Sequence, residues 1–320
     1  MFPGLKPVMT AIAMIGFVMP ATPGIARESS RVIHQERRVE RGSQIVIRNE
    51  FGNLRIAGSD RNTVEAVATD PHSLQAVPVS ISEASSGNKR VFTVSPIESG
   101  RGIKQKIDLE VKVPRDVELE PIYIRVGNIS VNDLDGGVRL RTDDGNITVR
   151  RVGSPGGGLV EVTAGSGNVD LSNINGDVRV VAISSNITVQ CVKGDVTGRV
   201  MSGQFEVSNI DGDVELNVSS GSAFFTGAIH PERRYRLKTL SGEIDMGVPD
   251  SVGFTAVLTS YSGQVDTDFQ FANDSQTPRR TNKRVVGKYG DGSGRIELDS
   301  FSGHVRLRKI VAGSGTDCQR

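Results

Sequence analysis

The basic residues of segment 270–284 form the densest group of charges that could bind a ligand. Arg279, Arg280, Lys283 and Arg284 stand in a polar stretch that lacks the apolar pattern of its surroundings. Four cations so close together could hold an anion, although a patternless polar stretch is more typical of a solvated loop. We therefore name these four residues as a possible binding loop and favour the solvated interpretation.

Residues that could perform catalysis or bind a metal are scattered. Zinc-ligand spacing is absent among the four histidines, which are His34, His72, His230 and His304. The run GDGSG at 290–294 lacks the GxSxG order of a nucleophile elbow. Carboxylate pairs at Asp143 and Asp144, or at Asp211 and Asp213, would suit a polysaccharide-cleaving β-helix enzyme. We expect no enzyme, no cofactor and no metal site, with a polysaccharide lyase or hydrolase as the alternative function.

A nine-residue repeat must position these side chains. Eighteen units can be aligned from Gly127 to the unit that opens at Gly303, and fourteen of them open on glycine. We number the opening residue of each unit as zero. Position two is then apolar in every unit except at Gly287, and position four is apolar in every unit except at Gly198 and Thr267. Alternation with period two predicts short strands that bury one face.

A third apolar position occurs at the seventh residue of many units, and we expect it to complete the core. These residues are Leu134, Val152, Ile174, Ile183, Val192, Met201, Ile210, Leu240, Tyr261, Phe301 and Ile310. The third position is polar and mixed in charge, which indicates a solvent face. A local cluster of aromatic residues, or of charges of one sign, among these outward residues would favour a binding function. An even mixture would favour a protein that acts only as a spacer.

One unit cannot bury its own apolar face, but stacked units can. Two units would make a coil of about 18 residues, so that like positions in successive coils pair in parallel. We predict an all-β fold, a two-sided parallel β-solenoid over residues 127–311, with a polar insertion at 270–284. Residues 44–126 are also rich in strand patterns. They are either an N-terminal β cap or irregular first coils of the same solenoid.

The residue after the opening glycine alternates in kind along the repeats. Asn128, Asn146, Asn168, Asn186 and Gln204 fall on one set of units, and Asp177, Asp195 and Asp213 fall on the other. Stacked Asn side chains can form an amide ladder. Stacked carboxylates repel unless turn N–H groups or cations satisfy them. We favour capping of the turns by Asp over calcium binding.

The first residues have the features of a secretory signal peptide. Lys6 precedes an apolar run, and small residues end at Ala26, so we expect cleavage there and a signal peptide over 1–26. An uncleaved anchor is the alternative. A flexible segment over 27–43 and a polar tail over 312–320 complete the predicted organisation. No later segment has the apolar length of a transmembrane span, so the mature chain is expected to be exported to the periplasm or the cell surface.

The net charge bears on the class of partner, and the two cysteines bear on disulfide formation. The formal net charge of +1 argues against nucleic acid as a partner. Cys191 lies within the repeats and Cys318 in the tail. An exported chain could pair them, but we favour a semi-buried thiol and a separate tail cysteine.

Two stretches carry a family resemblance. The run IDLEVKVPRDVELEPIYIRVGNISVNDLDGGVRLRTDDGNITV at 107–149 resembles the opening of the bacterial "putative adhesin" domain of unknown function, and GRIELDSFSGHVRLRK at 294–309 is similar to its last repeats. The resemblance covers roughly residues 44–310 and supplies no catalytic or ligand residues. It implies an exported or surface β-repeat protein of unknown biochemical role. From the repeats themselves we expect a non-enzymatic rod that is adhesin-like or envelope-associated, with an unknown envelope protein or glycan as its partner.

Overall fold

The computed structural model describes residues 35–40, 42–86, 89–97, 105–154, 157–272, 283–311 and 318. These residues belong to the compact unit Arg31–Arg320. The expected signal peptide, Arg279 and Arg280 lie outside the described ranges. Within those ranges the secondary structure is strand, and no helix has the length and hydropathy that a membrane span requires.

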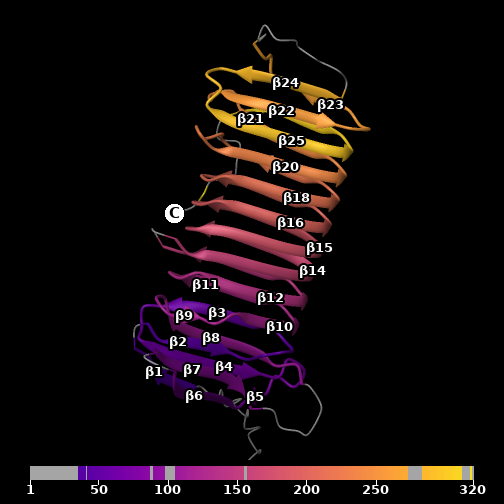
Figure 1. Ribbon diagram of the computed structural model, residues 1–320. Helices are drawn as coiled ribbons and strands as arrows, with labels where there is room; N and C mark the ends of the chain where they lie inside the picture. Colours follow the sequence, from indigo (N-terminus) through magenta and orange to yellow (C-terminus); the bar gives the residue numbers. More distant parts are fainter. Residues whose placement is uncertain are drawn as a thin grey trace, which may run out of the picture. The chain divides into compact units, whose positions relative to one another are not determined.

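One set of strands pairs in parallel to form a first wall, with β24 added antiparallel at its end (Figure 1). In spatial order these strands are β10 (Ile122–Val126), β12 (Val138–Asp144), β14 (Leu159–Ile174), β15 (Asp177–Val192), β16 (Val196–Ser202), β18 (Val214–Ser220), β20 (Arg234–Ser241), β25 (Gly294–Ser302), β22 (Phe254–Ser260) and β24 (Arg284–Tyr289).

A second set forms a second wall, also parallel. Its strands are β8 (Asp108–Pro114), β3 (Leu54–Ser59), β11 (Ile129–Leu134), β13 (Ile147–Val152), the second halves of β14 and β15, β17 (Phe205–Ile210), β19 (Ala223–Thr226), β21 (Ile244–Pro249), β26 (Val305–Ile310) and β23 (Val265–Thr267). Because β14 and β15 are each 16 residues long, they run through the turn and join the two walls.

The remaining strands lie before the repeats. They are β1 (Gln35–Arg38), β2 (Gln44–Ile47), β4 (Thr63–Thr69), β5 (Ala76–Val77), β6 (Val79–Ser86), β7 (Lys89–Pro96) and β9 (Glu118–Leu119). Strand β4 pairs antiparallel with β1, β5 and β8, whereas β6, β7, β2 and β9 form a separate four-stranded sheet. Strand β1 falls in the segment that was expected to be flexible.

Like positions pair with like, and the prediction of an all-β, mostly parallel repeat fold is confirmed. The amide N–H of Asn146 donates to the side chain of Asn128, 18 residues earlier. The same step is 22 residues between Asn146 and Asn168, across the GSPG insertion. Glycine opens most units because the turn is crowded. At Gly203 φ is +128°, and a Cβ would collide with the carbonyl of Ser185 in the preceding coil.

The expectation that the apolar residues at position seven complete the core is wrong for the first wall. Among the apolar residues at this position, Leu134, Val152, Ile174, Val192 and Ile210 of the second wall are buried, Ile310 of the same wall is partly buried, and the five first-wall residues are exposed. In the five second-wall units from the one that opens at Gly127 to the one that opens at Gly203, position six adopts a left-handed φ, which inserts a bulge and turns position seven inward. These bulge residues are Asp133, Arg151, Asn173, Cys191 and Asn209. In the first wall the alternation continues, so that position six, such as Ala182 or Val200, faces the core and position seven faces solvent.

The last coil departs from the expected order. Strands β25 and β26 enter between the β20–β21 coil and the β22–β23 coil, as Figure 1 shows for β25. The unit that opens at Val285 is also not a further parallel coil, because it forms β24 and runs antiparallel to β22. Its Gly287 lacks a Cβ, which makes room for the ring of Phe271.

The favoured interpretation of two unpaired cysteines is wrong, since Cys191 and Cys318 form a disulfide with their Cα atoms 5.5 Å apart. Cys191 occupies a bulge position, with φ of +58°, and is only partly buried. It lies on β15, whereas the chain enters the tail after β26, four strands away in the second wall. The disulfide therefore links the end of the chain to the middle of the stack.

Candidate functional site

Five large apolar side chains line one turn of the stack, and we call them the apolar ridge. In spatial order they are Ile183, Met201, Leu240, Phe301 and Tyr261, and each side chain is 54–67% exposed. All five occupy position seven of first-wall units, where the chain turns toward the second wall. Their strands are β15, β16, β20, β25 and the end of β22, which are neighbours except for β18 between β16 and β20.

The two aromatic residues of the ridge are in direct contact. The rings of Tyr261 and Phe301 stack with centroids 5.0 Å apart and planes inclined by 8°. The ammonium of Lys283 lies 5.9 Å from the centroid of the Tyr261 ring. Lys283, one residue of the predicted basic loop, therefore stands at one end of the ridge. Arg284 begins β24 and pairs with Thr259 of β22.

A column of serine residues accompanies the ridge, one position further along each unit. These exposed residues are Ser184, Ser202, Ser220, Ser241, Ser302 and Ser262. Backbone pairing keeps them in register, as for Ser220 with Ser241 and Ser241 with Ser302. The turn therefore presents an apolar side chain beside a hydroxyl in each of five coils.

The ridge is interrupted at β18, where position seven is Ser219. The gap belongs to an open recess of about 500 Å³ that spans β18, β20, β25 and β22. Leu240, Phe301 and Tyr261 form its apolar side. Its polar lining includes Asn217 and Lys238. The ammonium of Lys238 is held between two carboxylates of β25, at 4.0 Å from Glu297 and 3.9 Å from Asp299.

The Asp column lies at the opposite turn and acts through its hydrogen bonds. The carboxylate of Asp177 accepts the amide N–H of Asp195 at 2.9 Å, and that of Asp195 accepts the N–H of Asp213 at 2.9 Å. Asp213 in turn accepts the N–H of Arg234 at 3.0 Å. Each carboxylate thus caps the next coil, as the sequence suggested. Among the described residues, no cluster of three or more His, Cys, Asp or Glu side chains is arranged to hold a metal.

The other sequence candidates do not converge on one site. Asp143 accepts the hydroxyl hydrogen of Tyr123, and Asp144 accepts that of Ser166. Asp211 lies 3.6 Å from His230, near the Asp column. His304, in another part of the stack, contacts Asp266 at 2.6 Å.

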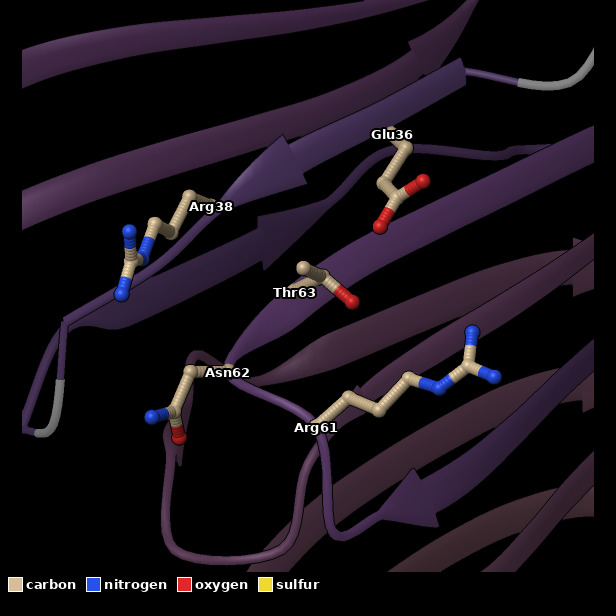
Figure 2. A pocket seen from close by; sticks show the side chains of 5 residues that line it. All are labelled: Glu36, Arg38, Arg61, Asn62 and Thr63. Carbon is tan, nitrogen blue, oxygen red and sulfur yellow. The ribbon is translucent and has the colours of Figure 1, made fainter.

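A second open hollow lies near β1 and β4, and its polar groups also diverge. It has a volume of about 550 Å³ and is lined by Glu36, Arg38, Arg61, Asn62 and Thr63. Figure 2 shows the guanidinium groups of Arg38 and Arg61 pointing in different directions, with Thr63 between them. Arg61 pairs with Glu65 at 3.1 Å. This hollow lacks the convergent groups of a binding site.

Sequence reasoning missed the ridge because it placed all the apolar residues at position seven in the core. The signal was position six, which is small or apolar in the parallel first-wall units and is occupied by Asp, Arg, Asn or Cys in the five second-wall units that contain the bulge. Asp and Asn tolerate the left-handed conformation that makes the bulge. The outward-facing residues at position three, among which a binding cluster was expected to show, are a mixture of polar and charged residues. The cluster lies in the seventh column instead.

Comparison with protein-family models matches residues 42–308 to the family described as Toastrack DUF4097. Among solved structures, the chain is similar to a "putative cell adhesion protein" from Clostridium sporogenes, with 10% identity, coverage of 88% of this chain and 100% of that chain, and a TM-score of 0.26. It is also similar to a "putative adhesin" from Bacteroides fragilis, with 14% identity, coverage of 88% and 98%, and a TM-score of 0.28. A search of curated proteins found no match.

Proposed function

The chain belongs to the Toastrack DUF4097 family, and from that premise we propose that it is an exported, non-enzymatic binding rod of the bacterial envelope. The rod is a two-sided solenoid with about 18 residues per coil, as the recurring step between paired residues supports. Export is proposed from the signal-like residues 1–26. The adhesin-like role follows from the family resemblance and from the surface described next.

The apolar ridge is the observation that carries the binding function. Exposed apolar side chains are ordinary when single, but a contiguous row marks an interaction site. Elsewhere the outer face of the first wall is mostly polar, with Tyr123, Val181 and Val286 as further exposed apolar residues, and several of its charges are paired across strands, as for Arg236 and Glu297 at 3.0 Å. A pure spacer has no use for five aligned apolar side chains in water, whereas a binding rod does.

The arrangement of the carboxylates supports a non-enzymatic role. Glycoside hydrolysis needs two carboxyl groups that face one another across a bond. Asp177, Asp195 and Asp213 instead point along the stack and accept backbone N–H groups of the next coil. We therefore expect the purified protein to leave a broad panel of polysaccharides uncleaved. Cleavage of any of them would contradict this part of the proposal.

The test compares binding to envelope fractions of the producing bacterium. The full chain would be compared with the ridge variant Leu240→Ser/Phe301→Ser and with the control Leu74→Ser, which changes an equally apolar, 72% exposed residue outside the ridge. We expect the ridge variant to lose at least about tenfold in retention, since each substitution removes apolar contact area. Circular dichroism would verify that all three proteins fold. Equal retention of all three would contradict a binding role for the ridge.

A further inference from the structure

We propose that the apolar ridge and its serine column bind an unbranched, uncharged, β-linked polysaccharide that lies along the stack, with about one sugar ring per coil. This inference rests on the proposed binding function and names its ligand class. It is carried by the spacing of the groups, the width of the surface, its charge and the recess at Ser219.

The spacing fits a polymer of sugars better than a polypeptide. Neighbouring coils are about 4.7–4.9 Å apart, and each coil along the ridge except the one at β18 adds one apolar side chain and one hydroxyl, as in Leu240 with Ser241 and Phe301 with Ser302. A pyranose ring in an extended β-linked chain advances by a similar distance and has an apolar C–H surface beside its hydroxyl groups. An extended peptide advances about 3.3 Å per residue and loses register after a few coils.

The width of the surface argues against a second copy of the chain. The ridge is one side chain wide, with Arg199 and Lys238 on one side and serine residues on the other. A stable protein interface buries about 800 Å² on each partner. A narrow row cannot supply that area, but a linear ligand does not require it. Contact with each sugar is weak, because Tyr261 and Phe301 stack on one another, and affinity must accumulate along the chain.

The charge beside the ridge favours a neutral ligand. Beside Leu240 and Phe301, the Lys238 ammonium is shared between Glu297 and Asp299, so this part of the flank offers an anion only a partnered cation and places two carboxylates nearby. A uronic acid polymer would meet these carboxylates and be repelled. The serine hydroxyls can both donate and accept hydrogen bonds, which matches the hydroxyl groups of a neutral sugar.

The recess at Ser219 points to a substituted sugar. An apolar side chain at this position would fill the gap, but Ser219 leaves an open volume of about 500 Å³ beside Leu240. The amide of Asn217 and the hydroxyl of Ser219 line it. An acetamido group carries an N–H, a carbonyl and a methyl, and these match the amide, the hydroxyl and the apolar wall. The N-acetylated member of the ligand class is therefore the favoured one.

Isothermal titration calorimetry on the full chain would test the inference with chitohexaose, cellohexaose, the α-linked maltohexaose and polygalacturonate as probes. We expect binding of both β-linked hexasaccharides, with chitohexaose tighter. Affinity should rise at least about tenfold from chitobiose to chitohexaose. Leu240→Ser should weaken chitohexaose at least about tenfold, and Leu74→Ser should not. Ser219→Leu should abolish the preference for chitohexaose over cellohexaose.

Several results would overturn the inference. Equal binding of maltohexaose or polygalacturonate would show that linkage and charge do not matter. Insensitivity of chitohexaose binding to Leu240→Ser would place the sugar elsewhere. A dimer in sedimentation equilibrium that is lost in the ridge variant would make the ridge an interface between copies. If the ridge variant loses envelope binding while no hexasaccharide binds, the glycan inference fails and the proposed function stands. If the ridge variant changes neither envelope binding nor hexasaccharide binding, both the glycan inference and the proposed function fail.

Discussion

Tyr261 and Phe301 stack ring on ring because β25 inserts beside β22, which brings together two units that are not consecutive in the chain. Their contact spans the boundary between the last coil in sequence and the coil that lies outside it. A parallel stack of this kind contributes about 0.5–1.5 kcal/mol beyond burial.

A double-mutant cycle with Tyr261→Ser and Phe301→Ser should therefore give a coupling free energy of about 0.5–1.5 kcal/mol in urea unfolding. The matched control is Tyr261→Ser combined with Met201→Ser. These two ridge residues are separated by several coils, so their effects should add within about 0.5 kcal/mol. Additive effects of Tyr261 and Phe301 would refute the stacked contact.

Removing the disulfide should destabilise the end of the stack. The bond joins residues 127 positions apart, and a cross-link of this kind contributes about 2–4 kcal/mol in typical cases. We expect Cys191→Ser, Cys318→Ser and the double variant to lower the urea midpoint by the same amount, because each removes the same bond. A double variant that is clearly less stable than either single variant would show that the two sulfurs act separately.

Replacing a residue of the Asp column should lower the free energy of unfolding, because its carboxylate caps a backbone N–H group of the next coil. Asp195→Ala removes the acceptor for the N–H of Asp213 and should cost about 1 kcal/mol in thermal or urea unfolding. Asp195→Asn keeps an oxygen at the same position and should cost less. Millimolar calcium should leave the melting temperature of the native chain unchanged. A rise with calcium, abolished by Asp195→Asn, would show that the column holds a cation.

Gly198 and Phe205 form a complementary pair in the core. Gly198 takes the fourth position of its unit, where the other first-wall strands place a side chain in the core, and a Cβ there would collide with the ring of Phe205. We expect Gly198→Val to cost about 1–3 kcal/mol through overpacking and Phe205→Val to cost a comparable amount through a cavity. The double variant should recover part of the loss. Equal or greater destabilisation of the double variant in urea unfolding would contradict this packing.

The pair of Asp133 and Arg151 should make stability depend on acid pH. Arg151 donates two hydrogen bonds to Asp133, at 2.6 and 2.9 Å, and this lowers the pKa of the Asp133 carboxyl from its ordinary 3.8. A lowered pKa adds stability above pH 3.8 that is lost as pH falls through the folded value. Urea unfolding across acid pH should show a smaller loss of stability in Asp133→Asn, and an intermediate loss in Arg151→Gln, because Arg115 remains 3.8 Å from the Asp133 carboxyl and also lowers its pKa. An unchanged pH dependence in both would contradict the role of the pair.

The parts of the fold that depend on local pattern were predictable from sequence. Alternating apolar residues specify which face is buried, and glycine marks the turns. The order of the last coil was not predictable, because β22 and β25 carry the same pattern and either could pair with β20. The ridge was hidden for a related reason. A bulge at one residue, such as Asn173, changes which side of the strand the next side chain faces. The amino-acid types found at bulges differ only weakly from those at other positions, so the sequence does not mark the bulges clearly.

The insertion of β25 and β26 also governs when the chain can finish folding. During synthesis each coil can add to the one before it up to β20 and β21, but the strands with which β22 and β23 pair in the native fold, β24, β25 and β26, are synthesised after them. They must wait for the last two strands, which then occupy the space between. A nascent or truncated chain that ends before Gly294 therefore carries open strand edges at β20 and β21 and at β22 and β23, and is the form most prone to aggregate. Addition of β25 and β26 closes all four edges.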